Sequence, residues 1–274
     1  MKASSVRAYF RVRPKGFVSG IRLLAAFASS VFLKAAMPSR FHSVGLLVRG
    51  SRNLRVTVDG IEFEVRPRTN DLDLISPKHE PVTTDWFRVR AGDIVVDVGA
   101  HIGRYTLKAA THKATVFAIE PDPWNFGLLE KNVRLNPPFN VILVPQAMTS
   151  KEGKLILSRA QKSNTGTSTV RVATPGGSSK STTEGEICVP GRTLDDLVKS
   201  HRLSRIDWLK IDVEGHEIAV LEGARSALDI TGRLILEVTD STDEVCRRIV
   251  EEHGFGLVAI ENGNPARTWL LMKG

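Results

Sequence analysis

The fold prediction starts from the stretch Ile94-Val95-Val96-Asp97-Val98-Gly99-Ala100-His101-Ile102-Gly103. Its first half is mostly apolar and predicts a buried strand. The glycines that follow allow a tight turn in which the backbone approaches a ligand without a Cβ clash. A dinucleotide-binding turn would place glycine at positions 99, 101 and 104, but this chain has His101 and Arg104 at the last two. The turn therefore indicates a cofactor without a pyrophosphate and disfavours a nicotinamide-dependent dehydrogenase.

Strands and helices alternate after this turn. The expected strands are Ile94–Val98, Thr115–Ile119, Val141–Val144, Lys154–Ser158, Asp207–Asp212 and Arg233–Val238. The expected helices are Arg104–Thr111, Pro123–Leu135, Thr193–His201, Glu217–Leu228 and Thr242–His253. Gly256–Ile260 and Thr268–Met272 form a closing antiparallel pair. This rhythm predicts an α/β domain over residues 93–274, with a doubly wound, mostly parallel sheet covered by helices on both faces.

Two segments precede that domain, and one polar stretch interrupts it. Residues 1–53 form a basic, partly helical arm, and residues 54–92 form a β-hairpin and a lead-in segment. The hairpin is indicated by two alternating runs around Asp59-Gly60, a pair that favours a two-residue turn. Gln161–Glu186 is dominated by Ser, Thr and Gly and predicts a loop or lid, with Asn164–Thr169 closing over acceptor and cofactor.

The composition excludes several classes of protein. The chain has 274 residues, of which 42% are apolar and 25% charged, so wholesale disorder is excluded. No run of 18 uncharged apolar residues occurs, which argues against a membrane-spanning helix. The two cysteines lie far apart and exclude a disulfide scaffold or a cysteine-rich zinc module.

The excess positive charge lies in the N-terminal arm. Residues 1–58 contain eleven Lys or Arg and no Asp or Glu, whereas the remaining 216 residues contain 27 basic and 30 acidic side chains. Within the arm, Phe17–Met37 has an apolar centre, Leu23–Leu33, that is too short to cross a bilayer but fits an amphipathic helix. Four roles stay open: packing on the domain, docking on an anionic membrane surface, binding nucleic acid, and a secretory signal.

Acidic side chains end the first two strands. Asp97 ends the first strand and can face a positively charged ligand group, and Glu120 ends the second and can accept both hydroxyls of a ribose. Gln146-Ala147 follows the third strand, in a position to contact an adenine edge. These positions predict a nucleoside cofactor, and S-adenosylmethionine, with its positive methionine part, suits them.

A second dense cluster is Leu209-Lys210-Ile211-Asp212-Val213-Glu214-Gly215-His216-Glu217. Asp212 ends a strand, where open α/β sheets bind their ligands. Glu237 ends the neighbouring strand, so the candidate catalytic residues Lys210, Asp212, Glu214, His216 and Glu237 converge on one mouth. A carboxylate or a neutral imidazole there can accept a proton from an attacking hydroxyl. Asp212 and Glu237 could hold a metal, but the sequence does not require one.

These stretches together resemble the FkbM family of S-adenosylmethionine-dependent methyltransferases. The matching runs are Asp97–Thr106, Glu120–Pro123 with Leu129 and Asn132, Asn164–Gly166, Thr193–Asp195, Leu209–Glu217 and Val220–Ala224. One departure is His101, where the family commonly has Asn. The resemblance implies a seven-stranded, Rossmann-like methyltransferase fold and methylation of a hydroxyl oxygen. The candidate cofactor residues are Asp97, Gly99, Ala100, His101, Gly103, Tyr105, Glu120, Pro121, Gln146 and Ala147.

We therefore expect an S-adenosylmethionine-dependent O-methyltransferase that acts on a sugar, a glycolipid or another small hydroxylated acceptor. Asp212 or His216 would deprotonate or orient the acceptor hydroxyl, and Lys210 would fix or neutralise the carboxylates. The cofactor favours a cytoplasmic location, with the basic arm at a membrane surface. The alternatives are an RNA methyltransferase whose arm holds phosphates, and a nonenzymatic membrane-associated module that retains a nucleoside pocket.

Overall fold

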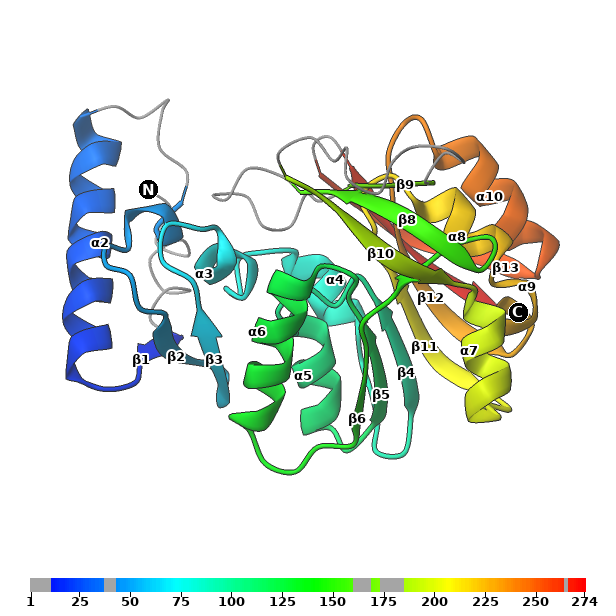
Figure 1. Ribbon diagram of the computed structural model, residues 1–274, viewed down its shortest axis with the longest axis horizontal. Helices are drawn as coiled ribbons and strands as arrows, with labels where there is room; N and C mark the ends of the chain where they lie inside the picture. Colours follow the sequence, from blue (N-terminus) through cyan, green and yellow to red (C-terminus); the bar gives the residue numbers. More distant parts are fainter. Residues whose placement is uncertain (1–10, 37–42, 160–168, 173–184, 264–265) are drawn as a thin grey trace.

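The central element is a seven-stranded sheet of order β13-β14-β12-β11-β4-β5-β6. The computed structural model describes residues 11–36, 43–159, 169–172, 185–263 and 266–274 (Figure 1). The strands are β4 (Ile94–Val98), β5 (Thr115–Ile119), β6 (Val141–Val144), β11 (Ile206–Ile211), β12 (Thr231–Val238), β13 (Phe255–Asn262) and β14 (Arg267–Lys273). β6, β5, β4, β11 and β12 are mutually parallel, and β14 pairs antiparallel with β12 and β13. The predicted doubly wound, mostly parallel sheet with a closing antiparallel pair is confirmed.

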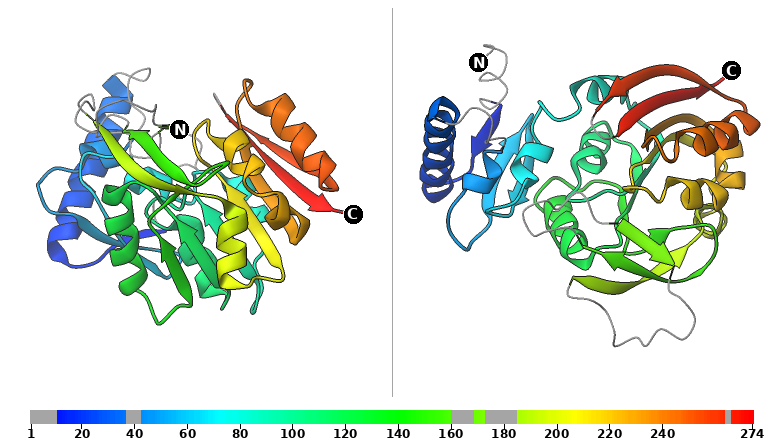
Figure 2. Two further views of the ribbon diagram at one scale, coloured as in Figure 1. Left: turned by 45° about the vertical axis from the view of Figure 1, so that its right-hand side comes forward. Right: turned by 90° about the horizontal axis from the view of Figure 1, so that it is seen from above.

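Helices cover both faces of this sheet (Figure 2). They are α5 (Arg104–Thr111), α6 (Pro123–Arg134), α7 (Leu194–His201), α8 (Glu217–Glu222), α9 (Arg225–Asp229) and α10 (Asp243–Glu252). The prediction of one helix over Glu217–Leu228 is wrong, because two short helices meet at Gly223. A Cβ at Gly223 would overlap the backbone carbonyl of Thr149, so the chain is held close to β7 there. Alternate strand residues fill two apolar layers, with Leu209 and Ile211 on one face and Trp208 on the other.

A second, four-stranded sheet has the order β7-β10-β8-β9. Its strands are β7 (Ala147–Met148), β8 (Gly153–Ser158), β9 (Thr169–Val172) and β10 (Glu186–Arg192). The prediction of a loop over Gln161–Glu186 is therefore wrong at β9 and at Glu186, where pairing with β8 supplies the backbone hydrogen bonds. The rest of that stretch, including Asn164–Gly166, lies outside the described residues.

The N-terminal unit comprises β1 (Val12–Pro14), α2 (Phe17–Ala36), the short 3-10 helix η1 (Gly45–Leu47), β2 (Leu54–Val58) and β3 (Ile61–Val65). Asp59 and Gly60 have φ of 51° and 84°, which confirms the predicted hairpin turn. β1 adds to β2, so the basic arm and the hairpin share one antiparallel sheet.

One asparagine in α6 and one just after its end attach this small sheet to the large domain. The Asn132 Oδ1 accepts from the Glu64 amide at 2.7 Å, and the Asn136 Oδ1 accepts from the Glu62 amide at 2.9 Å. These bonds satisfy the free edge of β3. The lead-in segment then passes through α3 (Asp71–Leu74) and α4 (Pro81–Trp86) before β4 begins.

The predicted helix in the arm is confirmed as α2, which lies at the outer edge of the molecule (Figure 1). It contacts β1, η1 and β2, and Ala26 and Ser30 are its buried side chains. In the part of the chain that the structure describes, no helix combines the length and the hydropathy that a membrane crossing needs.

Candidate functional site

A cavity of about 260 Å³ opens at the carboxyl ends of β4, β5, β11 and β12. This is the edge at which open α/β sheets bind their ligands. The predicted site residues among its lining are Asp97, Gly99, Ala100, His101, Tyr105, Glu120, Pro121, Ala147, Lys210, Asp212, Glu214, His216 and Glu237. Most of the predicted cofactor residues and all of the predicted catalytic residues therefore line the same cavity.

Two predicted cofactor residues do not line this cavity. Gly103 lies one step outside, where its φ of 99° starts α5 and where a Cβ would press on Leu129. Gln146 precedes β7, and the cavity wall there is made by Ala147 and Met148 instead. The predicted contact between Gln146 and an adenine edge therefore lacks support from the geometry.

The glycine turn joins the two halves of the site through the backbone. Gly99 has a φ of 85°, and a Cβ on it would overlap the carbonyl oxygen of Asp212. The Asp212 amide in turn donates to the Val98 carbonyl at 3.1 Å. Glycine is therefore required at position 99 both for its conformation and for this close approach.

Asp97 presents a buried oxygen without a partner to the cavity. Its side chain is 1% exposed, and its Oδ2 accepts from the Thr106 hydroxyl at 2.6 Å. Its Oδ1 has no hydrogen-bond partner among the described residues, and burial raises the pKa of this carboxyl. Because an unsatisfied buried acceptor is costly, a donor from a bound ligand fits here. The positively charged amino end of S-adenosylmethionine is such a donor.

Glu120 is held by backbone amides at the end of β5. Its Oε2 accepts from the His101 amide and its Oε1 from the Asp122 amide, each at 2.9 Å. The side-chain amide of Asn125 is a third partner. Burial raises the pKa of Glu120 to about 7. A carboxylate offers about four acceptor positions, so this arrangement fixes the group and still leaves capacity for a ribose hydroxyl.

His101 occupies the turn with a positive φ of 51°. Its Nε2 lies 3.9 Å from the Asp71 Oδ1, a carboxylate that the buried guanidinium of Arg66 binds through two hydrogen bonds. Burial lowers the pKa of His101 to about 4, so the imidazole is neutral near pH 7. A neutral polar ring here is compatible with the nucleoside site that the sequence predicts at Asp97 and Glu120.

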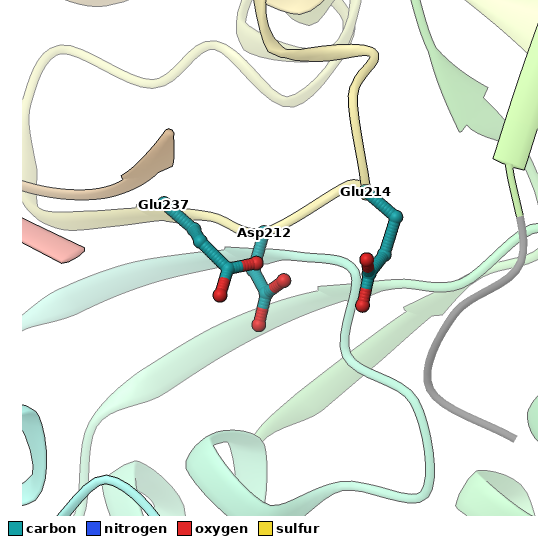
Figure 3. A group of neighbouring side chains, drawn as sticks. All are labelled: Asp212, Glu214 and Glu237. Atoms are coloured by element: carbon teal, nitrogen blue, oxygen red, sulfur yellow. The ribbon is translucent and has the colours of Figure 1, made fainter. Parts of the chain in front are cut away.

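Lys210, Asp212 and Glu237 form an interacting group of charges beside Asp97, because Lys210 is the partner of Asp97 across the neighbouring strands β11 and β4. Figure 3 shows Asp212 and Glu237. The Lys210 Nζ lies 2.7 Å from the Asp212 Oδ2, and the Glu237 carboxyl is hydrogen-bonded to that of Asp212. The charge of Asp212, together with burial, raises the pKa of Glu237 to about 10. Burial alone would raise the pKa of Asp212, but Lys210 and the Glu237 hydrogen bond keep it below its usual value. Near pH 7, Glu237 therefore holds a proton and Asp212 is ionised.

Glu214 and His216, in the turn before α8, also line the cavity. Burial and then the Asp212 charge raise the pKa of Glu214 to about 7. Burial lowers the pKa of His216, whose Nε2 lies 3.2 Å from the Thr149 hydroxyl. Both groups can accept a proton near neutral pH, as general-base catalysis requires.

One atom from each of Asp212, Glu214 and Glu237 lies within 4.8 Å of the others, a spacing that a metal ion could bridge. Figure 3 shows the carboxyl groups of Asp212 and Glu237 turned toward each other. The shared proton and the Lys210 ammonium already balance this charge. Asp212 and Glu237 therefore have partners within the chain itself.

Sequence reasoning missed Glu80, which lines the cavity from the lead-in segment. Its Oε2 accepts from the Tyr105 hydroxyl at 2.7 Å and lies 3.6 Å from the Arg104 Nη1. Burial opposes its ionisation, but the hydrogen bond and charge of His79, with Lys210 and Arg104, hold its pKa well below the usual range. Glu80 has a φ of 43°, a backbone conformation that residue type alone did not indicate.

A mostly parallel sheet with buried acids at the ends of β4 and β5 and a carboxylate–lysine group beyond β11 defines an α/β methyltransferase that binds a nucleoside cofactor. The profile described as "Methyltransferase FkbM domain" matches residues 97–259, which is more than half of the chain. The chain therefore belongs to the FkbM methyltransferase family, and S-adenosylmethionine is its methyl donor.

Two sequence relatives, described first below, agree with this assignment. The hexuronic acid methyltransferase AglP of Haloferax volcanii is 30% identical over 191 residues, which cover 69% of this chain and 72% of the relative. Methyltransferase 1 of Beauveria bassiana is 27% identical over 184 residues, covering 61% of this chain and 73% of that protein. Among solved structures, precorrin-6Y C5,15-methyltransferase from Geobacter metallireducens aligns with a TM-score of 0.44 at 18% identity, covering 71% of this chain and 87% of that one.

Proposed function

We propose that this chain transfers a methyl group from S-adenosylmethionine to a hydroxyl oxygen of a sugar or sugar-containing acceptor. The observation that carries the proposal is the ionised Asp212, held by Lys210 and by a protonated Glu237, in the same cavity as the acids of the predicted cofactor site and next to Asp97. The relative from Haloferax volcanii, named as a hexuronic acid methyltransferase, supports a sugar as the acceptor class.

The cofactor half of the cavity has the groups that this donor needs. Asp97 would hold the amino end through its unpartnered Oδ1, and Glu120 would accept from the ribose hydroxyls. The bound cofactor supplies a methyl carbon that is activated by its bond to a positively charged sulfur. The backbone contact between the Gly99 turn and Asp212 sets the spacing between this half and the acceptor half.

The acceptor half positions the hydroxyl and removes its proton. Asp212 accepts the hydrogen bond of the acceptor hydroxyl, and Lys210 keeps that carboxylate ionised and oriented. Glu214 is the stronger candidate for the base, because its pKa of about 7 matches the working pH better than that of Asp212. His216, neutral and 3.2 Å from Thr149, flanks the same position.

Methyl transfer requires the attacking oxygen in line with the carbon–sulfur bond, so placement supplies much of the rate. Well-oriented reactants gain up to roughly 7–11 kcal/mol over free encounter in solution. In this proposal, Asp212 provides the placement and Glu214 the proton transfer. We also propose a cytoplasmic location, since the methyl donor is available there.

The test is to incubate the full chain with methyl-labelled S-adenosylmethionine and either free hexuronic acids, sugar conjugates or RNA. Label in the sugar fraction that survives base hydrolysis of methyl esters supports O-methylation of a hydroxyl. Label found in RNA alone would show that the acceptor is RNA and not a sugar. Calorimetry that detected no binding of S-adenosylmethionine would reject the cofactor site itself.

A further inference from the structure

The outward side of α2 is apolar and uncovered. Its exposed large side chains repeat every three or four residues, as expected for one face of a helix. They are Phe17 (82% exposed), Val18 (67%), Ile21 (53%), Leu24 (70%), Val31 (45%) and Phe32 (72%). Ala25 and Ala28 lie exposed between them. We call these eight residues the α2 apolar face, and none of them carries a charge.

The other side of α2 already has its partners. Ala26 and Ser30 are buried there, and the Arg22 Nε donates to the Arg49 carbonyl at 2.7 Å. The inner side therefore fixes the helix against η1 and the small sheet. Figure 2 shows α2 at the margin of the molecule, with the small sheet of the N-terminal unit between α2 and the large sheet. Large exposed apolar patches of this kind mark interaction sites.

The charge around this face identifies its partner. The segment 1–58, which contains α2, carries eleven basic residues and no acidic residue. Of these, Arg13 is exposed in β1, which contacts α2, and Arg49 is exposed and lines a recess together with Phe32 of α2. An apolar face beside basic side chains complements an anionic lipid surface, where aliphatic groups enter the acyl boundary and cations meet phosphates. A second copy of the chain would bring two strongly basic segments together, which disfavours a dimer through this face.

We propose that α2 lies flat in the headgroup boundary of an anionic membrane, with the α2 apolar face toward the acyl chains. A 20-residue helix is about 30 Å long, so this face forms a long, shallow contact rather than a crossing. A recess between α2 and η1, lined by Phe32, Leu47 and Arg49 among others, continues the contact surface. The inference concerns membrane binding and does not depend on which acceptor the cavity takes.

The test is flotation of the full chain with vesicles of phosphatidylcholine containing about one-third phosphatidylglycerol, against vesicles of phosphatidylcholine alone. We expect binding to the anionic vesicles that weakens as salt is raised, because exposed charge pairs are screened. The double variant Leu24→Glu/Phe32→Glu should lose at least about tenfold in vesicle affinity, since each exposed aliphatic or aromatic side chain contributes to insertion. Arg13→Gln/Arg49→Gln should lose affinity for the anionic vesicles only, by about fivefold per residue removed.

The matched control is Val258→Glu, which places the same charge on another exposed apolar residue, in β13. It should bind vesicles as the unaltered chain does, and all variants should keep their affinity for S-adenosylmethionine by calorimetry. Equal vesicle binding by Leu24→Glu/Phe32→Glu would overturn the proposal. It would also be overturned if light scattering showed a dimer that this double variant dissociates, or if the basic residues bound RNA but not vesicles. A failure of methyl transfer would leave these readouts unchanged.

Discussion

The N-terminal unit and the methyltransferase domain distribute the same kinds of side chain in opposite ways. In the domain, large apolar residues are buried in the sheet, and charged groups such as Lys210 and Asp212 converge on an enclosed cavity. In the N-terminal unit, α2 exposes its large apolar residues, and residues 1–58 carry eleven basic side chains and no acidic one. The first arrangement suits chemistry on a small ligand, and the second suits attachment to a broad surface. Changes in one region should therefore leave the function of the other intact.

The largest effect should come from Asp212→Asn. Loss of the carboxylate removes the group that orients the acceptor hydroxyl, and we expect turnover to fall by about three orders of magnitude. Affinity for S-adenosylmethionine should stay within about threefold, since the cofactor contacts that we propose are those of Asp97 and Glu120. Single-turnover kinetics and calorimetry measure the two quantities. Asp229→Asn, at a side chain that is 66% exposed and remote from the cavity, is the control and should keep full turnover.

Gly99→Ala should damage both halves of the site at once. The added Cβ would meet the Asp212 carbonyl at a φ of 85°, and we expect a loss of about 3 kcal/mol in the free energy of unfolding. Urea unfolding measures this loss. Gly127→Ala in α6, where a Cβ meets nothing within 4 Å, should instead be neutral or slightly stabilising. Equal stability of the two variants would show that the turn tolerates a side chain.

Glu214→Gln tests the assignment of the base. With a pKa of about 7, Glu214 is protonated at acidic pH and ionised above neutrality, so kcat should fall about tenfold per pH unit below pH 7. The variant should lose about two orders of magnitude in kcat at pH 8 and should also lose this pH dependence. The profile is measured at saturating cofactor, so that Glu120 does not contribute. If kcat of the Glu214→Gln variant still falls below pH 7, Glu214 is not the general base and His216 takes that role.

Tyr105→Phe removes the hydroxyl that donates to Glu80 at 2.7 Å. Because a hydrogen bond to a charged group is lost and the Glu80 oxygen is left partly unpaired, we expect a loss of about 1.5 kcal/mol in the free energy of unfolding. The cavity wall formed by Glu80 should also loosen, which would raise KM for the acceptor more than it lowers kcat. A change in kcat alone would argue that Tyr105 contacts the reacting atoms.

The smallest effect should come from Leu24→Glu in the absence of lipid. The side chain is 70% exposed, so the free energy of unfolding should change by less than about 0.5 kcal/mol. Turnover of a soluble sugar acceptor should be unchanged as well. Thermal unfolding and a steady-state assay check both values. A large loss of stability would mean that the α2 apolar face supports the fold itself and would remove the contrast between the two regions.

The sequence predicted most of the fold and the cavity because those features depend on local patterns. Apolar runs such as Ile94–Val98 mark buried strands, and polar residues at strand ends such as Asp97 and Asp212 must meet at one edge of a parallel sheet. Features that depend on distant contacts could not be predicted in this way. The break at Gly223 depends on the backbone of Thr149, and the cavity position of Glu80 depends on a left-handed backbone in the lead-in segment.

The outward face of α2 illustrates the same limit. The sequence predicted an amphipathic helix with its apolar centre at Leu23–Leu33. In the structure, Leu24 and Val31 are exposed whereas Leu23 and Phe27 are half-buried. When nearly every position of a helix is apolar, periodicity cannot select the buried side, and contacts with β1, β2 and η1 decide it.

The main-chain contact between Val98 and Asp212 has a practical consequence for engineering. Because two backbone segments set the distance from the cofactor wall to Asp212, exchanges of side chains elsewhere should not shift that distance. The outer walls are supplied by separate pieces of chain, with Asn70, Leu74 and His79 on one side and Met148 and Leu157 on the other. Libraries that vary only these wall positions should change which alcohols the enzyme accepts, while the distance between Asp212 and the cofactor wall stays the same.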